Sequence, residues 1–176
     1  MRQSSASGAQ HPRVLGMAVG SVHLFYGLAG SGKTTLAREL SSGGCGVRFT
    51  LDELMLRLHP DLNFESVDYG EKAAEVREVI WTIAEQILVA GVDVILDWNS
   101  WSVARRSWVV ERASAIGAPV LLHTLTASLE VASNRVQDRT ASGARFAHPV
   151  TTEGNQHLAS LMEEPSNSEG MEIHRY

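Results

Sequence analysis

Residues 27–34 read Gly-Leu-Ala-Gly-Ser-Gly-Lys-Thr, and the fold can be worked out from this stretch. It fits the pattern G-x-x-x-x-G-K-[ST] at every fixed position. The apolar run at residues 22–26 precedes it and predicts a buried parallel strand. Residues 33–40 follow with apolar side chains at helical spacing, and the glycines after them predict the end of that helix. The sequence therefore predicts a strand, a glycine-rich turn and a helix in direct succession.

This order of elements suits the binding of a polyphosphate chain, as in a P-loop. Glycines let the backbone turn and approach an anion closely, so that successive N–H groups point at the phosphates. The helix that begins near Lys33 offers its positive end to the same charge. Lys33 supplies a cation for the β- and γ-phosphates, and the Thr34 hydroxyl can ligate Mg²⁺. The expected nucleotide-binding residues are Gly27, Leu28, Ala29, Gly30, Ser31, Gly32, Lys33, Thr34 and Thr35.

The rest of the chain alternates between predicted strands and helices. Further strands are predicted at residues 47–51, 92–96, 120–125 and 172–175. Further helices are predicted from near Asp68, where Glu71 completes a capping box, to Gly91, and at residues 102–116, 128–140 and 151–162. This alternation predicts an α/β fold of three α/β/α layers, with a mostly parallel sheet of about five strands covered by helices on both faces.

Length, charge and cysteine content narrow the class of protein. The 176 residues suit one domain with short appendages. Residues 1–19, rich in Ser, Ala, Gly and Gln, predict a disordered extension with Met17 as an alternative start, and residues 20–176 form the domain. With a net charge of −5, the chain lacks the overall positive charge that favours binding to duplex DNA or to an anionic membrane. The single cysteine, Cys45, excludes a disulfide within the monomer and favours the cytoplasm.

Asp97 is the first candidate carboxylate, at the end of the predicted strand 92–96. If this strand neighbours strand 22–26, the ends of the two strands lie about 5 Å apart. Asp97 would then face a magnesium ion beside Thr34, as a Walker-B carboxylate does. The alternative interpretation is that Asp97 caps the following turn.

Asp52 is the second candidate carboxylate, and it follows the predicted strand 47–51. In an open α/β sheet the carboxyl ends of the strands line the ligand site. A carboxylate there can take the proton of an acceptor hydroxyl that attacks the γ-phosphate. The alternative is that Asp52 caps a helix over residues 53–58.

Aromatic and basic side chains follow Asp97 in the sequence. Trp98, Asn99 and Trp101 can form one wall of an acceptor site, or a hydrophobic plug between sheet and helix. Arg105 and Arg106 lie in the first turns of the next helix, where they can contact the substrate.

Two further arginines, Arg135 and Arg139, lie four residues apart on a later helix and so share a face. They can reach over the triphosphate as lid arginines, or form surface ion pairs. His23 and His123 lie in predicted strands and are interpreted as packed core residues.

The sequence resembles small P-loop kinases of the AAA-type ATP-binding group, related to chloramphenicol phosphotransferase and zeta toxin. The matching stretches are residues 27–37, 51–53, 94–102 and 164–170, and the resemblance runs from about residue 20 to the end. It implies a core like that of nucleoside monophosphate kinases, Asp52 as the base on an acceptor hydroxyl, and a lid at about 135–150. Some relatives carry a phosphate-contacting arginine where this chain has Val103, and Arg105 or Arg106 could take that role.

The leading hypothesis is a cytoplasmic kinase that uses ATP and Mg²⁺ to phosphorylate a hydroxyl of a small molecule. Lys33, Asp52, Arg135 and Arg139 are its candidate catalytic residues, and Thr34 and Asp97 its metal ligands. One alternative is a polynucleotide 5′-hydroxyl or nucleoside kinase, although the acidic balance argues against a nucleic-acid partner. Another is a nucleotide-binding regulator or toxin-like protein with weak ATPase activity. The sequence leaves open the acceptor, the choice of ATP or GTP, and the oligomeric state, and it predicts no membrane span.

Overall fold

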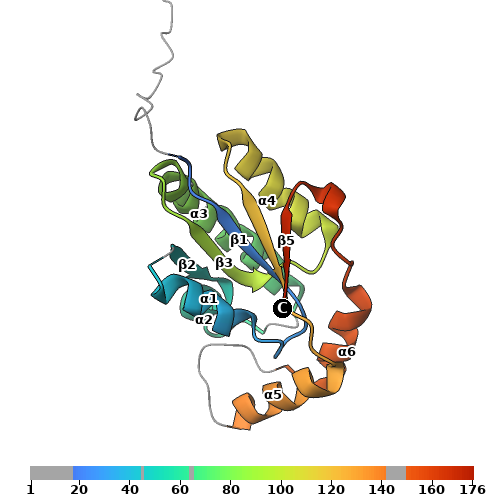
Figure 1. The fold of residues 1–176 in the computed structure, drawn as a ribbon. Coiled ribbons are helices and arrows are strands. Elements are labelled where there is room, and N and C mark those ends of the chain that lie inside the picture. Colours follow the sequence, from blue (N-terminus) through green and yellow to red (C-terminus); the bar gives the residue numbers. More distant parts are fainter. Residues whose placement is uncertain (1–17, 45, 64–65, 142–149) are drawn as a thin grey trace, which may run out of the picture.

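The computed structural model describes residues 18–44, 46–63, 66–141 and 150–176. These residues form a sheet of five parallel strands in the order β2-β3-β1-β4-β5 (Figure 1). The strands are β1 (Val22–Tyr26), β2 (Val47–Thr50), β3 (Val94–Asn99), β4 (Val120–Thr124) and β5 (Glu172–Arg175). The α/β class and the parallel sheet of five strands that the sequence predicted are therefore confirmed.

Helices cover both faces of the sheet. On one face, α1 (Lys33–Ser42) packs its buried Ala37 against Phe25 of β1 and Ile95 of β3. On the other face, α3 (Val67–Val89) and α4 (Val103–Ile116) bury apolar side chains against Leu24 and Leu96. Because β1 and β3 are covered on both sides, they read in the sequence as continuous apolar runs.

Four further elements complete the described structure. The helix α2 (Leu51–Leu58) follows β2 directly, and the 3₁₀ turn η1 (Asn167–Glu169) precedes β5. The helices α5 (Leu129–Ala141) and α6 (Thr152–Leu161) lie together beyond the carboxyl ends of the strands (Figure 1). The carboxyl edge of the sheet is thus surrounded by helix ends and by the turn after β1.

Side-chain caps fix the starts of several helices. The hydroxyls of Ser102 and Thr151, the first residues of two helices that the sequence predicted, accept hydrogen bonds from backbone amides of α4 and α6. The cap of α3 is Ser66, whose Oγ accepts from the amide of Tyr69, so the predicted cap at Asp68 is wrong. The earlier start adds one residue to the helix before Asp68.

Two further differences concern the candidate carboxylates. β3 continues to Asn99, which places Asp97 inside the strand, whereas α2 begins at Leu51 and places Asp52 in its first turn. Trp81 of α3 is buried in the core, with its ring against that of Trp108. The predicted disordered extension falls mostly on residues 1–17 and the predicted lid largely on 142–149; these and Cys45 lie outside the described residues.

None of the helices that the structure describes is long and apolar enough to cross a membrane.

Candidate functional site

The turn between β1 and α1 has the backbone of a phosphate-binding loop. Gly30 and Gly32 adopt φ angles of +85° and +106°, which L side chains rarely allow. Gly32 is the N-cap of α1, where no side chain caps the helix and no acidic residue occupies the first turn. The positive end of α1 is therefore left for an anion rather than for a protein carboxylate.

The loop is held in place by α5 and α6, an arrangement that the sequence reasoning missed. Asn155 of α6 is fully buried; its Oδ1 accepts from the amide of Ala29 at 3.1 Å and its Nδ2 donates to the carbonyl of Ala29 at 3.0 Å. A Cβ built on Gly30 would lie 2.2 Å from the carbonyl oxygen of Ala132 in α5. The loop thus has almost no freedom to move toward either helix.

Lys33 and Ser31 provide the polar side chains of the loop. The ammonium of Lys33 donates to the carbonyl oxygens of Gly27 and Leu28 at 2.8 and 2.7 Å, which holds it over the loop. The buried hydroxyl of Ser31 has no hydrogen-bond partner among the described residues. Such an orphan hydroxyl normally indicates a missing partner, and it fits a phosphate oxygen.

Thr34 and Asp97 lie together, as the sequence predicted they would if the two strands were neighbours. β3 pairs with β1, and the Thr34 hydroxyl donates to Asp97 Oδ1 at 3.1 Å. The second oxygen of Asp97 accepts from Arg48 Nε at 2.9 Å, and the same guanidinium donates to Glu53 at 2.9 Å. Arg48, which the sequence reasoning did not weigh, fixes the orientation of the Asp97 carboxylate.

Asp52 lies at the same edge of the sheet. Thr50 of β2 pairs with Asp97, so Asp52 follows two residues beyond that register point. Its negative charge affects the ionisation of the Tyr69 hydroxyl. Burial, and then the charge of Asp52, raise the pKa of Tyr69 to about 12, while the positive charge of Arg77 opposes this shift. Asp52 therefore belongs to a charged group with Tyr69 and Arg77.

The residues after β3 form an aromatic and basic wall. Arg105 stacks over the ring of Trp101 at 4.8 Å and donates to the carbonyl of Asn99 at 3.4 Å. Burial, and then the nearby charge of Arg77, lower the pKa of Arg105 to about 10. Trp98 is buried, and Asn99 Oδ1 has no hydrogen-bond partner in the described part of the chain. These four residues remain candidates for acceptor contacts.

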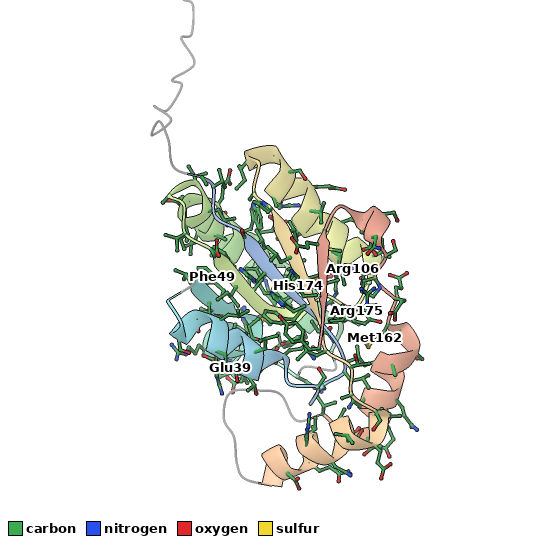
Figure 2. All side chains as sticks on the ribbon, viewed as in Figure 1. Glu39, Phe49, Arg106, Met162, His174 and Arg175 are labelled. Carbon is green, nitrogen blue, oxygen red and sulfur yellow. The ribbon has the colours of Figure 1, made fainter. Side chains whose placement is uncertain are left out.

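Arg106 does not belong to this wall, and the expectation that it contacts substrate is corrected here. It is fully buried and donates to both carboxylate oxygens of Glu169, at 2.6 and 3.1 Å. It also donates to the carbonyl oxygens of Ser100 and Glu163. Arg106 thus joins α4 to the C-terminal segment, beside which it lies in Figure 2.

The predicted lid arginines lie on α5. Arg135 is exposed, one residue before Val136, which packs on the loop at Gly30. Arg139 lies near the end of the same helix, and its side chain is outside the described residues. Their role stays a prediction.

The chain is similar in fold to several solved structures. A protein of Chloroflexus aurantiacus J-10-fl assigned as a kinase is 18% identical, with a TM-score of 0.72 and coverage of 92% of this chain and 86% of that one. Chaetomium thermophilum Kti12 in complex with ADP-AlF3 is 21% identical, with a TM-score of 0.64 and 88% of each chain covered. Mycobacterium tuberculosis APS kinase CysC in complex with AMPPNP and APS is 20% identical, with a TM-score of 0.58 and coverage of 90% and 89%. At these identities the likeness shows the fold.

Among sequences, the mitochondrial methionyl-tRNA formyltransferase of Saccharomyces cerevisiae (strain ATCC 204508 / S288c) is 32% identical over 124 residues, which are 69% of this chain. The chain spans 28% of the length of that relative.

The family model AAA_33, which describes an AAA domain, matches residues 22–165. This match runs from the first strand through the phosphate-binding loop, Asp97 and α6, and so includes every part of the site described above. The chain therefore belongs to the AAA_33 family of AAA domains, and it has the fold of a small P-loop kinase.

Proposed function

We propose that this chain is an ATP-dependent phosphotransferase that moves the γ-phosphoryl group to a hydroxyl of a small molecule. The observation that carries the proposal is the contact of Thr34 with Asp97 beside the uncapped start of α1. A hydroxyl and a carboxylate at that position form the metal-binding pair of P-loop enzymes. We also propose that residues 20–176 act as one phosphotransferase domain.

The loop residues fit a nucleotide triphosphate. Residues 27–35 would hold the phosphates through backbone amides, the orphan hydroxyl of Ser31 and the ammonium of Lys33. To reach a phosphate oxygen, Lys33 would exchange one of its two carbonyl partners for a stronger, charge-assisted hydrogen bond. We propose ATP as this nucleotide.

Thr34 and Asp97 fit a hard divalent cation, because hydroxyl and carboxylate oxygens are the ligands that Mg²⁺ prefers. Mg²⁺ would neutralise charge on the β- and γ-phosphates. Arg48 keeps one oxygen of Asp97 engaged, so the other oxygen, which now accepts from Thr34, is the one presented to a cation.

Asp52 is the proposed general base. In the transfer the acceptor oxygen forms a bond to the γ-phosphorus, the bond from that phosphorus to the bridging oxygen of ADP breaks, and Asp52 takes the hydroxyl proton. The position of Asp52 in the first turn of α2, beside the edge of the sheet that carries Asp97, supports this role. Arg135 and Arg139 are proposed to stabilise the charge of the transferred group.

Formyl transfer needs no polyphosphate-binding loop, and we do not extend the activity of the yeast relative to this chain. A polynucleotide kinase and a nucleotide-dependent regulator differ from the proposal in what stimulates ADP release. Measuring what stimulates ADP release therefore separates the proposed small-molecule kinase from a polynucleotide kinase and from a regulator.

The test combines nucleotide binding with turnover. Calorimetric titration should show binding of Mg·ATP that Lys33→Ala weakens at least tenfold, while Lys72→Ala on the exposed surface of α3 leaves it unchanged. ADP release should rise when a panel of small hydroxyl compounds is added, and Asp52→Asn should lower the stimulated rate by about 10²–10⁴. The control Asp61→Asn, at an exposed position, should keep that rate.

Absence of Mg·ATP binding at millimolar concentration would contradict the proposal as a whole. Stimulation only by oligonucleotides with a free 5′-hydroxyl would favour the polynucleotide kinase. Slow ADP release that no acceptor changes would favour the regulator.

A further inference from the structure

A pocket of about 220 Å³ lies between α3, α4 and the end of β3. Two tryptophans, Trp98 and Trp108, form apolar walls, and two arginines, Arg77 and Arg105, supply its cationic groups. The lining residues are Ala74, Arg77, Glu78, Trp98, Ala104, Arg105 and Trp108. Since an apolar cavity of about 150 Å³ can bind benzene, the pocket has room for an oxyanion with a ring or short chain attached.

Neither pocket arginine forms a salt bridge with a carboxylate among the described residues, although the charge of Glu78 acts on Arg77 and opposes the lowering of its pKa by burial. Among the described residues, the guanidinium of Arg105 donates to the carbonyl of Asn99 and stacks on the ring of Trp101. Burial lowers the pKa of both guanidiniums, and the charge of Arg77 lowers that of Arg105 further. Both groups stay protonated at neutral pH, so they repel each other across the pocket.

Glu78, the carboxylate that lines the pocket, is paired with Arg112, which is not among the lining residues. Glu78 accepts from Arg112 Nη2 at 2.9 and 3.2 Å and from Trp108 Nε1 at 3.2 Å. Arg112 also stacks over the ring of Trp108 at 4.1 Å, which fixes the aromatic wall. With Glu78 occupied in this way, the pocket presents a net positive charge from Arg77 and Arg105.

Two residues of the pocket lie near the proposed base and metal-binding pair. Arg77 and Asp52 both act electrostatically on Tyr69, and Arg105 reaches Asn99, two residues after Asp97. An acceptor anchored between the arginines would extend from the pocket toward Asp52 at the carboxyl edge of the sheet. The residues that line the pocket come from α3, β3 and α4 and not from the phosphate-binding loop, which supports an acceptor in it rather than the nucleotide.

We propose that this pocket binds an oxyanion carried by the acceptor, and that Arg77 and Arg105 make the enzyme specific for acceptors with a phosphate, sulfate or carboxylate group. The inference rests on the proposed function, since it names the substrate class of the same site. Planar guanidiniums bind all three oxyanions through paired N–H groups. Trp98 and Trp108 would pack against the part of the acceptor that bears the group.

The test measures anion binding with the phosphate-binding loop blocked. Protein saturated with Mg·AMP-PNP is titrated with phenyl phosphate, phenyl sulfate and benzoate, and with benzyl alcohol as the neutral probe, by tryptophan fluorescence and calorimetry. At least one anion should bind tenfold or more tightly than benzyl alcohol, and the ranking of the three identifies the preferred oxyanion. Arg77→Gln and Arg105→Gln should each weaken that binding at least tenfold, while the matched control Arg38→Gln, exposed on α1, should not.

Turnover supplies a second readout. For a hydroxyl acceptor offered with and without its phosphate, such as ribose 5-phosphate and ribose, KM should rise at least tenfold on loss of the phosphate or of either arginine. Equal binding of charged and neutral probes, or anion binding that both glutamine variants retain, would overturn the inference while nucleotide binding stands. Failure of Mg·AMP-PNP to bind would instead contradict the proposed function. Far-UV circular dichroism confirms that each variant is folded.

Discussion

Arg106 shows how much one buried charge can contribute to this fold. Its guanidinium is fully buried and binds Glu169 through two hydrogen bonds. We expect Arg106→Met to lower the free energy of unfolding by about 3–5 kcal/mol, because it leaves Glu169 without its counterion. Urea denaturation measures this. The control Arg112→Met breaks the more exposed pair with Glu78 and should cost about 0–1 kcal/mol; equal losses in the two variants would contradict the argument.

At Gly30 the backbone conformation and its close packing fix the shape of the phosphate-binding loop. It combines a φ of +85° with contact to the carbonyl of Ala132, 2.2 Å from where a Cβ would lie. We expect Gly30→Ala to push the loop away from α5 and to weaken Mg·ATP binding at least tenfold, measured by calorimetry. Gly70→Ala, where a Cβ meets nothing within 4 Å, is the matched control and should bind as the unaltered protein does.

At the scale of elements, α3 contains a glycine that its packing does not require. Gly70 lies near the start of α3, and a Cβ there would have open space around it. Alanine loses less backbone entropy than glycine in a helix, so Gly70→Ala should stabilise the protein by about 0.5–1 kcal/mol. A thermal melt should show a Tm higher by about 1–4 °C. An unchanged or lower Tm would contradict this prediction and would mean that the start of α3 contributes little to the stability of the folded protein.

Most of the helices and strands could be predicted from the sequence, for a physical reason. Strands buried on both faces must be apolar throughout, so the runs around Leu24 and Leu96 predicted β1 and β3 directly. The ends of elements were less certain, because they depend on partners. β3 continues through Asp97 to Asn99 because β2 and β1 pair with it there, and Ser66 caps α3 because its hydroxyl reaches the amide of Tyr69.

At the scale of the whole molecule, the sheet order assembles a site that the sequence could give only in part. The phosphate-binding loop and Asp97 were predictable, because motif and strand end identify them. Arg48, Arg77 and Asn155 were not, since each acts through residues distant in sequence: Asn155 contacts Ala29 across 126 positions. Only the folded arrangement shows which of the many polar side chains in helices and strands meet at the carboxyl edge.

A cluster of aromatic and imidazole rings spans three strands of the same sheet and connects its stability to pH. His123 of β4 stacks on His23 of β1 at 5.2 Å and lies 5.5 Å from His174 of β5, which Figure 2 labels. One ring nitrogen of His123 lies 2.9 Å from His23 and the other 3.0 Å from the Tyr176 hydroxyl. Burial, then the charges that His23 and His174 would carry, lower the pKa of His123 to about 4.

This lowered pKa sets the sign of the pH dependence. An unfolded histidine titrates near 6.5, so below that pH the unfolded chain binds more protons than the folded one, and stability falls toward pH 4. We expect the free energy of unfolding to drop between pH 6.5 and 5, a window above most carboxylate titration, by up to about 1.4 kcal/mol per pH unit for this one proton. Two carboxylates face the cluster and can offset part of the charge: Asp93 lies 3.5 Å from His23, and Glu172 lies 3.0 Å from His174.

Urea denaturation at several pH values measures this slope. His123→Gln, which cannot titrate, should flatten the slope between pH 6.5 and 5, whereas the control His157→Gln, exposed on α6, should keep it. A slope that persists unchanged in His123→Gln would assign the pH dependence to groups outside the sheet. A flattened slope would show that three parallel strands depend on one imidazole staying neutral, because β1 and β5 each place a ring against His123 of β4.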